Sequence, residues 1–418
     1  MRAAAAALLA AGLLAGCGAQ HGSVATGPGV TSAPCPTAVN QGHGCIYLGI
    51  ISDLSSTFKG IGVPVTEAQQ AFWKRVNQQG GIAGYDIDAT TYVKDNKYDP
   101  AVHKRLYEQM KGKVLALAQT LGSTQTAGIL PDLKADKMLA VPMSFTSAWA
   151  FQPQLLRFGP SYCFQAMNAV DYAAAGYHPK SILSVYYQSD YGGDANAGAE
   201  IAAKNDGIAF TALPTLAGLD KQAASIDAIV KTKPDLVVLA TGPADAGKVV
   251  AEAAARGYKG HFFGVSPVWH KSLMSGKAAQ AIKDQYTQVG LWKPFAADSP
   301  GDAAMRQALG TVDPDDSFVS GWVSSYELKA ILVRAAQNGD LTRAGLMKAA
   351  GQITSVDFEG IMPAAAGNLA GDAGTVAFRQ SVMLKPDDNE FTKVRVVQDF
   401  ATGPTASGYT FKAPCSTQ

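Results

Sequence analysis

Three turns rich in hydroxyl groups carry the side chains best placed to bind a small molecule. Each turn follows a short apolar run and precedes a helix-like stretch: residues 52–58, 119–126 and 142–147. Backbone N–H groups at a helix start, helped by Ser and Thr hydroxyls, suit a carboxylate or another small anion. Ser and Thr are also preferred helix caps, so capping explains any single turn better. Three such turns at equivalent places favour a shared binding cleft.

The residues that usually perform catalysis are not arranged for it. The six histidines are scattered, and none has a partner at the spacing of a metal site. Gly60-Ile61-Gly62 lacks the third glycine of a dinucleotide loop, and neither a P-loop nor a Gly-x-Ser-x-Gly motif occurs. Turn and cap roles explain acids such as Asp315 and Asp316 more simply than acid–base pairs do. We therefore expect no enzyme, no metal and no cofactor.

The elements that must position these turns alternate along the chain. Short apolar runs predict strands at residues 46–51, 85–93, 114–118, 138–141, 181–187, 236–240, 261–265 and 286–289. Ala-rich stretches predict helices between them, including 195–204, 221–231, 244–256 and a long amphipathic helix over 318–338. Strand, helix and strand at this pace predict an α/β fold with parallel sheets flanked by helices.

Composition limits the partners. The net charge of +1 argues against nucleic acid, because phosphate binding needs clustered Lys and Arg. Hydrophobic residues make up 47% and charged residues 17% of the chain, so a large core can form. The 402 residues after position 16 are too many for one core and favour two domains.

The first residues have the pattern of an export signal. Arg2 precedes an Ala/Leu/Gly run, and small residues lead to Cys17, so residues 1–16 are predicted to be removed. Leu14-Ala15-Gly16-Cys17 resembles the lipobox of bacterial lipoproteins, in which the cysteine carries diacylglycerol. An ordinary secretory signal with an incidental cysteine is the alternative. Residues 17–45, rich in Gly, Ser and Pro, are then expected to form a flexible tether that buries nothing.

Four further cysteines fit an oxidising compartment. Cys35, Cys45, Cys163 and Cys415 allow three pairings, which sequence alone does not resolve. We favour Cys35–Cys45, which closes a short loop, and Cys163–Cys415, which ties the C-terminus to mid-chain. Free buried thiols are the alternative.

The order of several short motifs makes a family recognisable. The motifs lie at residues 77–84, 95–100, 122–126, 141–147, 189–192 and 233–237. In this order the chain resembles the solute-binding lipoproteins of ABC importers, specifically the branched-chain amino acid (Leu/Ile/Val) type. The likeness runs from about residue 46 to residue 400, which is nearly all of the mature body.

The resemblance implies the periplasmic-binding-protein type I fold. Two α/β lobes would be joined by three hinge crossovers, near residues 157–163, 282–291 and 378–384. Lobe 1 would comprise residues 46–160 plus 288–381, and lobe 2 residues 161–287 plus 382–418. Such a protein is extracytoplasmic and lipid-anchored to the bacterial membrane, and we expect a monomer. It closes on a small-molecule solute and docks on an ABC permease, whose ATPase is cytoplasmic.

The resemblance also indicates site residues. The turn with Leu121, Gly122 and Ser123 and the turn with Ser144, Phe145 and Thr146 match segments that hold the ligand carboxylate. Tyr191 matches an aromatic residue that closes over the ligand, and Thr241-Gly242 matches a turn lining the cleft.

One position departs from the family pattern. Amino-acid binders place a carboxylate about where Ser266 stands, to pair with the ligand's ammonium. Because an unpaired buried ammonium costs several kcal/mol, either Asp245 substitutes or the ligand lacks an α-ammonium.

Aromatic residues suggest an apolar body for the ligand. Phe58, Phe145, Trp149, Tyr191 and Trp269 could line the cleft, although Phe145 and Trp149 fit plain core packing equally well. The ligand is then an amino acid, a short amide, or an aromatic or aliphatic carboxylate. An extracytoplasmic sensor of the same fold, signalling to a membrane partner, is the alternative function. Nothing in the sequence recommends a hydrolase.

Overall fold

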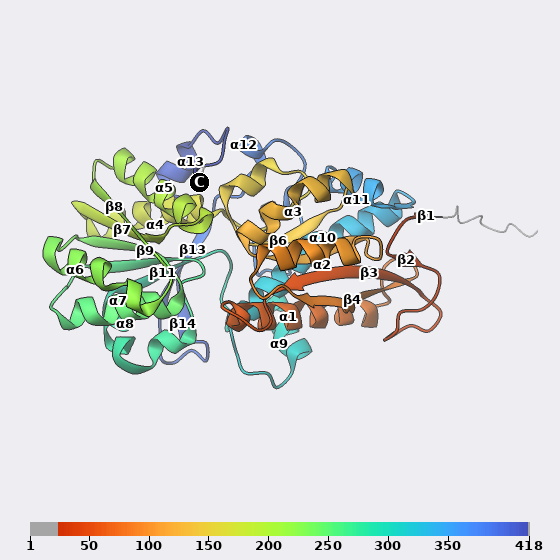
Figure 1. Cartoon of the computed structure of the whole chain (residues 1–418), viewed down its shortest axis with the longest axis horizontal. Coiled ribbons are helices and arrows are strands. Elements are labelled where there is room, and N and C mark those ends of the chain that lie inside the picture. The colour runs from red at the N-terminus through yellow and green to blue at the C-terminus, as the bar shows by residue number, and fades with distance from the viewer. Residues whose placement is uncertain (1–23, 417–418) are drawn as a thin grey trace, which may run out of the picture.

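The computed structural model describes residues 24–416. The predicted signal peptide (1–16) and the predicted lipidation site Cys17 lie outside the described residues. Two α/β lobes lie side by side, and the chain passes between them three times (Figure 1). Within residues 24–416, no helix combines the length and the apolar character that a membrane crossing requires.

Lobe 1 is built on a five-stranded sheet. Its strands are β2 (Val30–Thr31), β3 (Gly44–Ser52), β4 (Tyr85–Asp95), β5 (Ala116–Leu121) and β6 (Ala140–Met143). β3 pairs in parallel with β4 and β5, β5 pairs in parallel with β6, and the short β2 runs antiparallel to β3. The helical elements are α1 (Lys59–Gln78), α2 (Pro100–Met110), α3 (Ser123–Ala135), η1 (Ser147–Phe151), α9 (Pro300–Leu309), α10 (Ser317–Gln337), α11 (Arg343–Ala350) and η5 (Ala364–Gly367).

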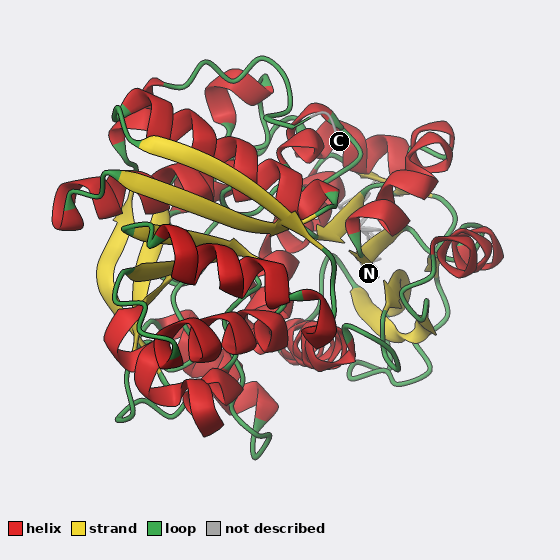
Figure 2. Cartoon of the chain, turned by 60° about the vertical axis from the view of Figure 1, so that its left-hand side comes forward, coloured by secondary structure: helices red, strands yellow, loops and turns green. Residues whose placement is uncertain are grey.

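Lobe 2 is built on a seven-stranded mixed sheet. In spatial order its strands are β14 (Val394–Ala401), β13 (Ser381–Pro386), β11 (Tyr286–Gly290), β10 (His261–Val265), β9 (Leu236–Ala240), β7 (Ser181–Tyr187) and β8 (Ala209–Thr215). Its helical elements are α4 (Tyr162–Tyr177), α5 (Asp190–Asn205), η2 (Leu219–Lys221), α6 (Ala223–Thr232), α7 (Pro243–Ala255), η3 (Lys271–Met274), η4 (Gly276–Ala278), α8 (Ala279–Gln285), α12 (Ala373–Val376) and α13 (Pro404–Gly408). Helices cover both faces of the sheet (Figure 2).

Buried strands explain this architecture. All residues of β5, β9 and β11 are buried, which is typical of parallel strands covered on both faces. The aromatic core of lobe 1 joins α1 to α10, where the rings of Phe72 and Trp322 lie 5.1 Å apart. Asp99 caps α2 by accepting hydrogen bonds from the N–H groups of Ala101 and Val102, and Pro100 occupies its first turn. The α/β two-lobed fold is as predicted.

The end of the chain differs from an all-parallel arrangement. β13 runs antiparallel to β11, and β14 antiparallel to β13, so the hairpin extends the sheet of lobe 2. Because β11 lies wholly in this sheet, lobe 2 continues to Gly290, whereas the predicted boundary after residue 287 would divide the strand. The chain crosses between lobes over residues 152–161, 291–299 and 368–380.

Residues 24–45 of the predicted tether are packed on lobe 1. β1 (Ala25–Thr26) pairs with β12 (Asp340–Leu341), and β2 pairs with β3. Asp86 of β4 accepts hydrogen bonds from the N–H groups of Val39 and Asn40, at 2.8 and 2.9 Å. Cys35 is buried. Backbone pairing and a disulfide therefore hold this segment, although its composition resembles a linker.

Both favoured disulfides are present. Cys35–Cys45 links the N-terminal segment to β3, and Cys163–Cys415 links the first turn of α4 to the end of the chain. Each bond lies within one lobe, so neither ties the two lobes together.

Candidate ligand-binding cleft

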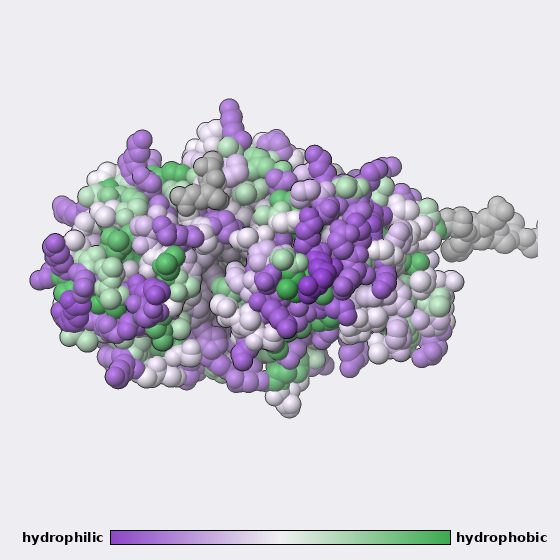
Figure 3. Space-filling view, in the orientation of Figure 1, coloured by the Kyte–Doolittle hydropathy of each residue, from purple (hydrophilic) through white to green (hydrophobic). Residues whose placement is uncertain are grey.

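A cleft of about 1400 Å³, its open mouth included, lies between the two lobes. The molecular surface is visibly hollowed there (Figure 3). Lobe 1 contributes the turns that follow β3, β5 and β6, and lobe 2 those that follow β7, β9 and β10. The cleft therefore lies beyond the carboxyl ends of parallel strands from both sheets, where open α/β sheets bind ligands.

All but one of the predicted ligand-binding residues line this cleft. They are Phe58, Leu121, Gly122, Ser123, Ser144, Phe145, Tyr191, Gly242, Ser266 and Trp269. Thr146 is the exception: its hydroxyl oxygen accepts a hydrogen bond from Ala148 N–H and begins η1. Thr146 lines a second, smaller cavity instead. Capping, the alternative considered for each turn, explains Thr146.

Lobe 1 presents hydrogen-bond donors to the cleft. α3 begins at Ser123 directly after Gly122, whose φ of 101° lies in the left-handed region that favours glycine. Gly122 has no side chain to cap the first N–H groups of α3. Ser144 Oγ accepts a hydrogen bond from Trp149 Nε1 at 3.0 Å, which leaves its own O–H to donate elsewhere. Trp149 itself is buried in the core of lobe 1.

Lobe 2 presents an aromatic wall to the cleft, and most polar atoms of this wall form hydrogen bonds within the protein. The Tyr191 hydroxyl donates to the carbonyls of Val265 and Thr241, at 3.0 and 3.3 Å, and so joins the ends of β9 and β10. Its ring packs 4.7 Å from the ring of Tyr162. The Ser266 hydroxyl donates to Val289 O at 3.2 Å. Tyr191 and Ser266 therefore contribute mainly to the shape of the cleft, because their hydroxyl groups already have partners within the protein.

Asp245 does not supply the missing counter-charge. It is buried, and one carboxylate oxygen accepts hydrogen bonds from Tyr187 Oη at 2.6 Å, Gly218 N at 2.8 Å and Gln222 Nε2 at 3.2 Å. It is not among the cleft-lining residues. Its role is to hold the loop before η2 against α7.

The acids that line the cleft in the described chain are Asp315 and Asp316, which sequence analysis assigned only to turns. Burial raises the pKa of Asp315, but hydrogen bonds from His270 and Ser317 outweigh it and leave the pKa below its usual value. Burial raises the pKa of Asp316 to about 7, and Phe295 N–H donates to it at 2.8 Å. Asp315 thus faces His270, and Asp316 accepts a backbone hydrogen bond from Phe295, so both acids already have partners within the protein.

Charged pairs join the lobes at the mouth of the cleft. His270 Nε2 of lobe 2 lies 3.3 Å from Asp315 Oδ2 of lobe 1. Lys271 Nζ lies 2.6 Å from Asp313 Oδ2 and also donates to Pro314 O. Both His270 and Lys271 therefore already have acidic partners on the opposite lobe.

Further aromatic residues complete the walls. Tyr98 packs 4.5 Å from Phe58, and Trp292 packs 5.6 Å from Phe145, measured between ring centroids. Sequence analysis missed both. Trp292 lies two residues after β11 and could have been found from its place near a strand end, whereas Tyr98 lies in a turn whose position only the folded chain defines.

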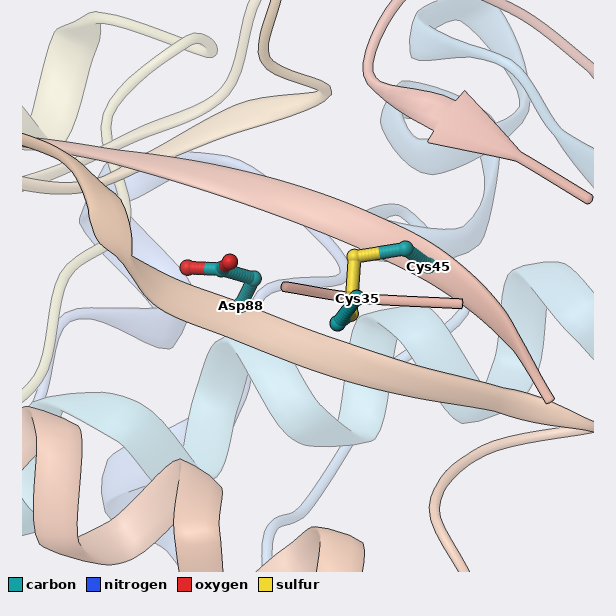
Figure 4. Close-up of side chains that lie close together, drawn as sticks. All are labelled: Cys35, Cys45 and Asp88. Atoms are coloured by element: carbon teal, nitrogen blue, oxygen red, sulfur yellow. A yellow bond between two sulfur atoms is a disulfide. The ribbon is translucent and has the colours of Figure 1, made fainter. Parts of the chain in front are cut away.

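One cluster of metal-ligand residue types occurs among the described residues, and it is not a metal site. Cys35, Cys45 and Asp88 lie together, but the two sulfurs are bonded to each other (Figure 4). Metal-binding cysteines coordinate as thiolates, which a disulfide does not supply. Asp88 accepts hydrogen bonds from Thr90 and Thr91 instead.

Comparison with known proteins establishes the family. A periplasmic binding protein family model matches residues 46–381, so the chain belongs to that family. A search of curated proteins gives no match. The family works outside the cytoplasm, and its members bind solutes rather than catalyse reactions.

Solved structures agree on the fold. A fatty acid ABC transporter substrate-binding protein from Thermomonospora curvata superposes with a TM-score of 0.83 at 26% identity, covering 93% of this chain and 97% of that one. A branched-chain amino acid ABC transporter protein from Thermus thermophilus, with bound valine, superposes with a TM-score of 0.73 at 14% identity. The match covers 87% of this chain and 98% of that one. A leucine-binding protein from Thermotoga maritima superposes with a TM-score of 0.69 at 14% identity. The match covers 86% of this chain and 99% of that one.

A buried acid lies beside the first crossover. Glu327 of α10 is fully buried, and its charged form is favoured by the side chain and the backbone N–H of Arg157. Burial raises the pKa of Glu327 to about 8, although the positive charge of Arg157 opposes the shift. Arg157 itself donates to Ala150 O at 2.9 Å.

We predict that Glu327 makes the protein less stable as pH rises. Its folded pKa of about 8 exceeds the usual value of about 4.3, so between these values the folded state holds a proton that the unfolded state releases. Stability therefore falls as pH increases through this window. Glu327→Gln should reduce the loss between pH 5 and pH 8, measured by urea denaturation. Glu67→Gln, at an exposed position of α1, is the control, and equal pH slopes in both variants would contradict the assignment.

Proposed function

We propose that this protein captures a small carboxylate-bearing solute with a largely apolar body, by closure of its lobes, and delivers it to an ABC permease. The observation that carries the proposal is the character of the cleft. Hydroxyl groups and a helix start face it from lobe 1, aromatic rings line both sides, and the cleft-lining acids already have partners within the protein.

The ligand carboxylate is assigned to lobe 1. The start of α3 offers backbone N–H groups with the partial positive charge of a helix N-terminus, and the Ser144 hydroxyl offers a further donor. Both follow neighbouring strands, β5 and β6, so they approach the cleft from the same sheet edge.

An aliphatic acid fits the remaining walls better than an amino acid. An α-ammonium would need a carboxylate that is not already engaged. Asp245 is occupied within lobe 2, Asp315 faces His270, and the partly buried Asp190 forms a hydrogen bond with Ser123. The likeness to the Thermomonospora fatty acid-binding protein supports the same choice. Within the broader class of carboxylates, we therefore favour a fatty acid over leucine or valine.

Isothermal titration against a panel tests the ligand class. The full-length protein, stripped of co-purifying lipid, is titrated with octanoate, palmitate, phenylacetate, leucine, a short amide, glucose and spermidine. We expect the aliphatic acids to bind more tightly than leucine by at least about tenfold, because burying an unpaired ammonium costs more than 1.4 kcal/mol. Tight binding of glucose or spermidine, with no response to any carboxylate, would overturn the proposal.

Tyr191→Ala tests the aromatic wall. Loss of the ring should weaken binding of the best aliphatic acid about tenfold or more, because an aromatic side chain contributes 1–2 kcal/mol of apolar contact. Tyr191→Phe keeps the ring and removes only the bonds to β9 and β10, so its affinity should fall less. Thermal unfolding of both variants checks that the fold is retained. Equal affinity of Tyr191→Ala and wild type would remove Tyr191 from the site.

Membrane attachment is proposed through Cys17. The Leu14-Ala15-Gly16-Cys17 motif supports cleavage before Cys17 and acylation of its thiol. Mass spectrometry of the full chain expressed in a bacterial host with lipoprotein-processing enzymes should find a diacylglycerol-modified N-terminal Cys17. Cys17→Ser should release the protein from the membrane fraction with its ligand affinity unchanged. An unmodified wild-type N-terminus would contradict the anchor.

A further inference from the structure

A second cavity lies at the hinge, next to the cleft. Its empty space is about 510 Å³, open mouth included. Its walls are mainly aromatic and aliphatic, with Trp149, Phe158, Phe164, Phe378 and Phe411 among them. They come from both lobes and from the first and third crossovers. We name this space the hinge cavity.

Two residues, Ser144 and Phe145, line both the cleft and the hinge cavity. The Phe145 ring is therefore part of the wall between the two spaces. Its centroid lies 5.3 Å from that of Phe158, 5.9 Å from that of Tyr162 and 5.6 Å from that of Trp292. Its backbone is fixed as well, because Phe145 O accepts a hydrogen bond from Tyr162 N–H at 2.8 Å.

We propose that the hinge cavity receives the distal end of the ligand's acyl chain, and that Phe145 limits which chain lengths reach it. This inference rests on the proposed function. A short acid fills the cleft alone, whereas a long chain passes Phe145 and buries further methylene groups among the rings of the hinge cavity. Each buried methylene favours binding by about 0.8 kcal/mol.

The surroundings of Arg157, the charged residue of the hinge cavity, favour binding of the acyl tail there rather than the carboxylate. Arg157 lines the cavity, but its guanidinium donates to Ala150 O and faces the buried Glu327. The start of α3 lines the cleft and not the hinge cavity, and its backbone N–H groups can bind an anion there. The cleft is therefore the better site for the carboxylate, and the hinge cavity is the better site for the apolar tail.

Filling the hinge cavity tests the proposal. Ala377 lines the hinge cavity and not the cleft, so Ala377→Phe should obstruct the tail while leaving the carboxylate site intact. We expect palmitate affinity to fall about tenfold or more, and octanoate affinity to stay within about twofold. Ala365→Phe makes the same substitution at an exposed position of η5, outside both cavities, and should change neither affinity. Phe145→Ala should raise the ratio of palmitate to octanoate affinity.

Fluorescence quenching locates the tail in the unaltered protein. Trp149 lines the hinge cavity and not the cleft. Palmitate brominated at its last carbon should quench Trp149, identified as the emission lost in Trp149→Phe. Octanoate brominated at its last carbon should quench Trp149 less, because its shorter chain ends in the cleft. This measurement does not depend on whether Ala377→Phe folds.

The outcomes separate the two proposals. If wild type binds both acids but their affinity ratio is the same in Ala377→Phe and Ala365→Phe, the hinge cavity holds no part of the ligand and the inference is overturned. Equal or stronger Trp149 quenching by the brominated octanoate would show that the hinge cavity does not receive the tail of the longer acid, and would also overturn the inference. If wild type binds neither acid, the proposed fatty acid function falls, and the inference falls with it.

Discussion

The basic side chains that line the cleft, His270 and Lys271, have acidic partners within the protein, and the proposed ligand class depends on this pairing. Lys271 and His270 of lobe 2 face Asp313 and Asp315 of lobe 1. Because a buried charge without a partner is costly, a ligand bringing its own charge must find a group that is not already engaged. The groups that remain are the donors of lobe 1 and a set of aromatic rings. This combination suits a carboxylate with an apolar body.

The two-lobed arrangement makes the site depend on closure. Each sheet ends its parallel strands at the cleft, so each lobe alone offers only one wall. A ligand shifts the open–closed equilibrium only by the contacts it makes in the closed form. Protein contacts between the lobes also contribute: Asp194 of α5 accepts a hydrogen bond from Ser147 N–H of η1 at 2.9 Å. Burial raises the pKa of Asp194 to about 7, so this contact belongs to a desolvated part of the hinge.

Much of this structure was predictable from the sequence, because local patterns govern it. Buried strands are recognisable in the sequence as apolar runs, and Asp99-Pro100 marks the start of α2. The strand-end turns pointed correctly to the cleft, since the carboxyl ends of parallel strands share one edge of a sheet. The family resemblance added Tyr191 and Gly242, which local patterns alone would not have singled out.

The rest depends on contacts between distant parts of the chain. Asp316 reaches the cleft only because the second crossover returns the chain to lobe 1, and Phe295 N–H of that segment then bonds to it. Thr146 lies in the turn after β6, which borders the cleft, but its hydroxyl faces the backbone of η1. Residues 24–45 have a linker's composition, yet pairing with β3 and β12 and the Cys35–Cys45 bond hold them. No local pattern encodes these partners.

The position of Phe145 couples the ligand to the hinge. Phe158 lies in the first crossover, Tyr162 directly follows it, and Trp292 lies in the second, so Phe145 packs against segments that join the two lobes. Edge-to-face contacts of this kind contribute about 0.5–1.5 kcal/mol each and depend on geometry. A ligand that presses on Phe145 therefore acts directly on the packing of two crossovers. In the proposed binding mode, the apolar body of the ligand therefore contacts the side chain against which two crossovers pack, so ligand length and hinge packing are physically linked there.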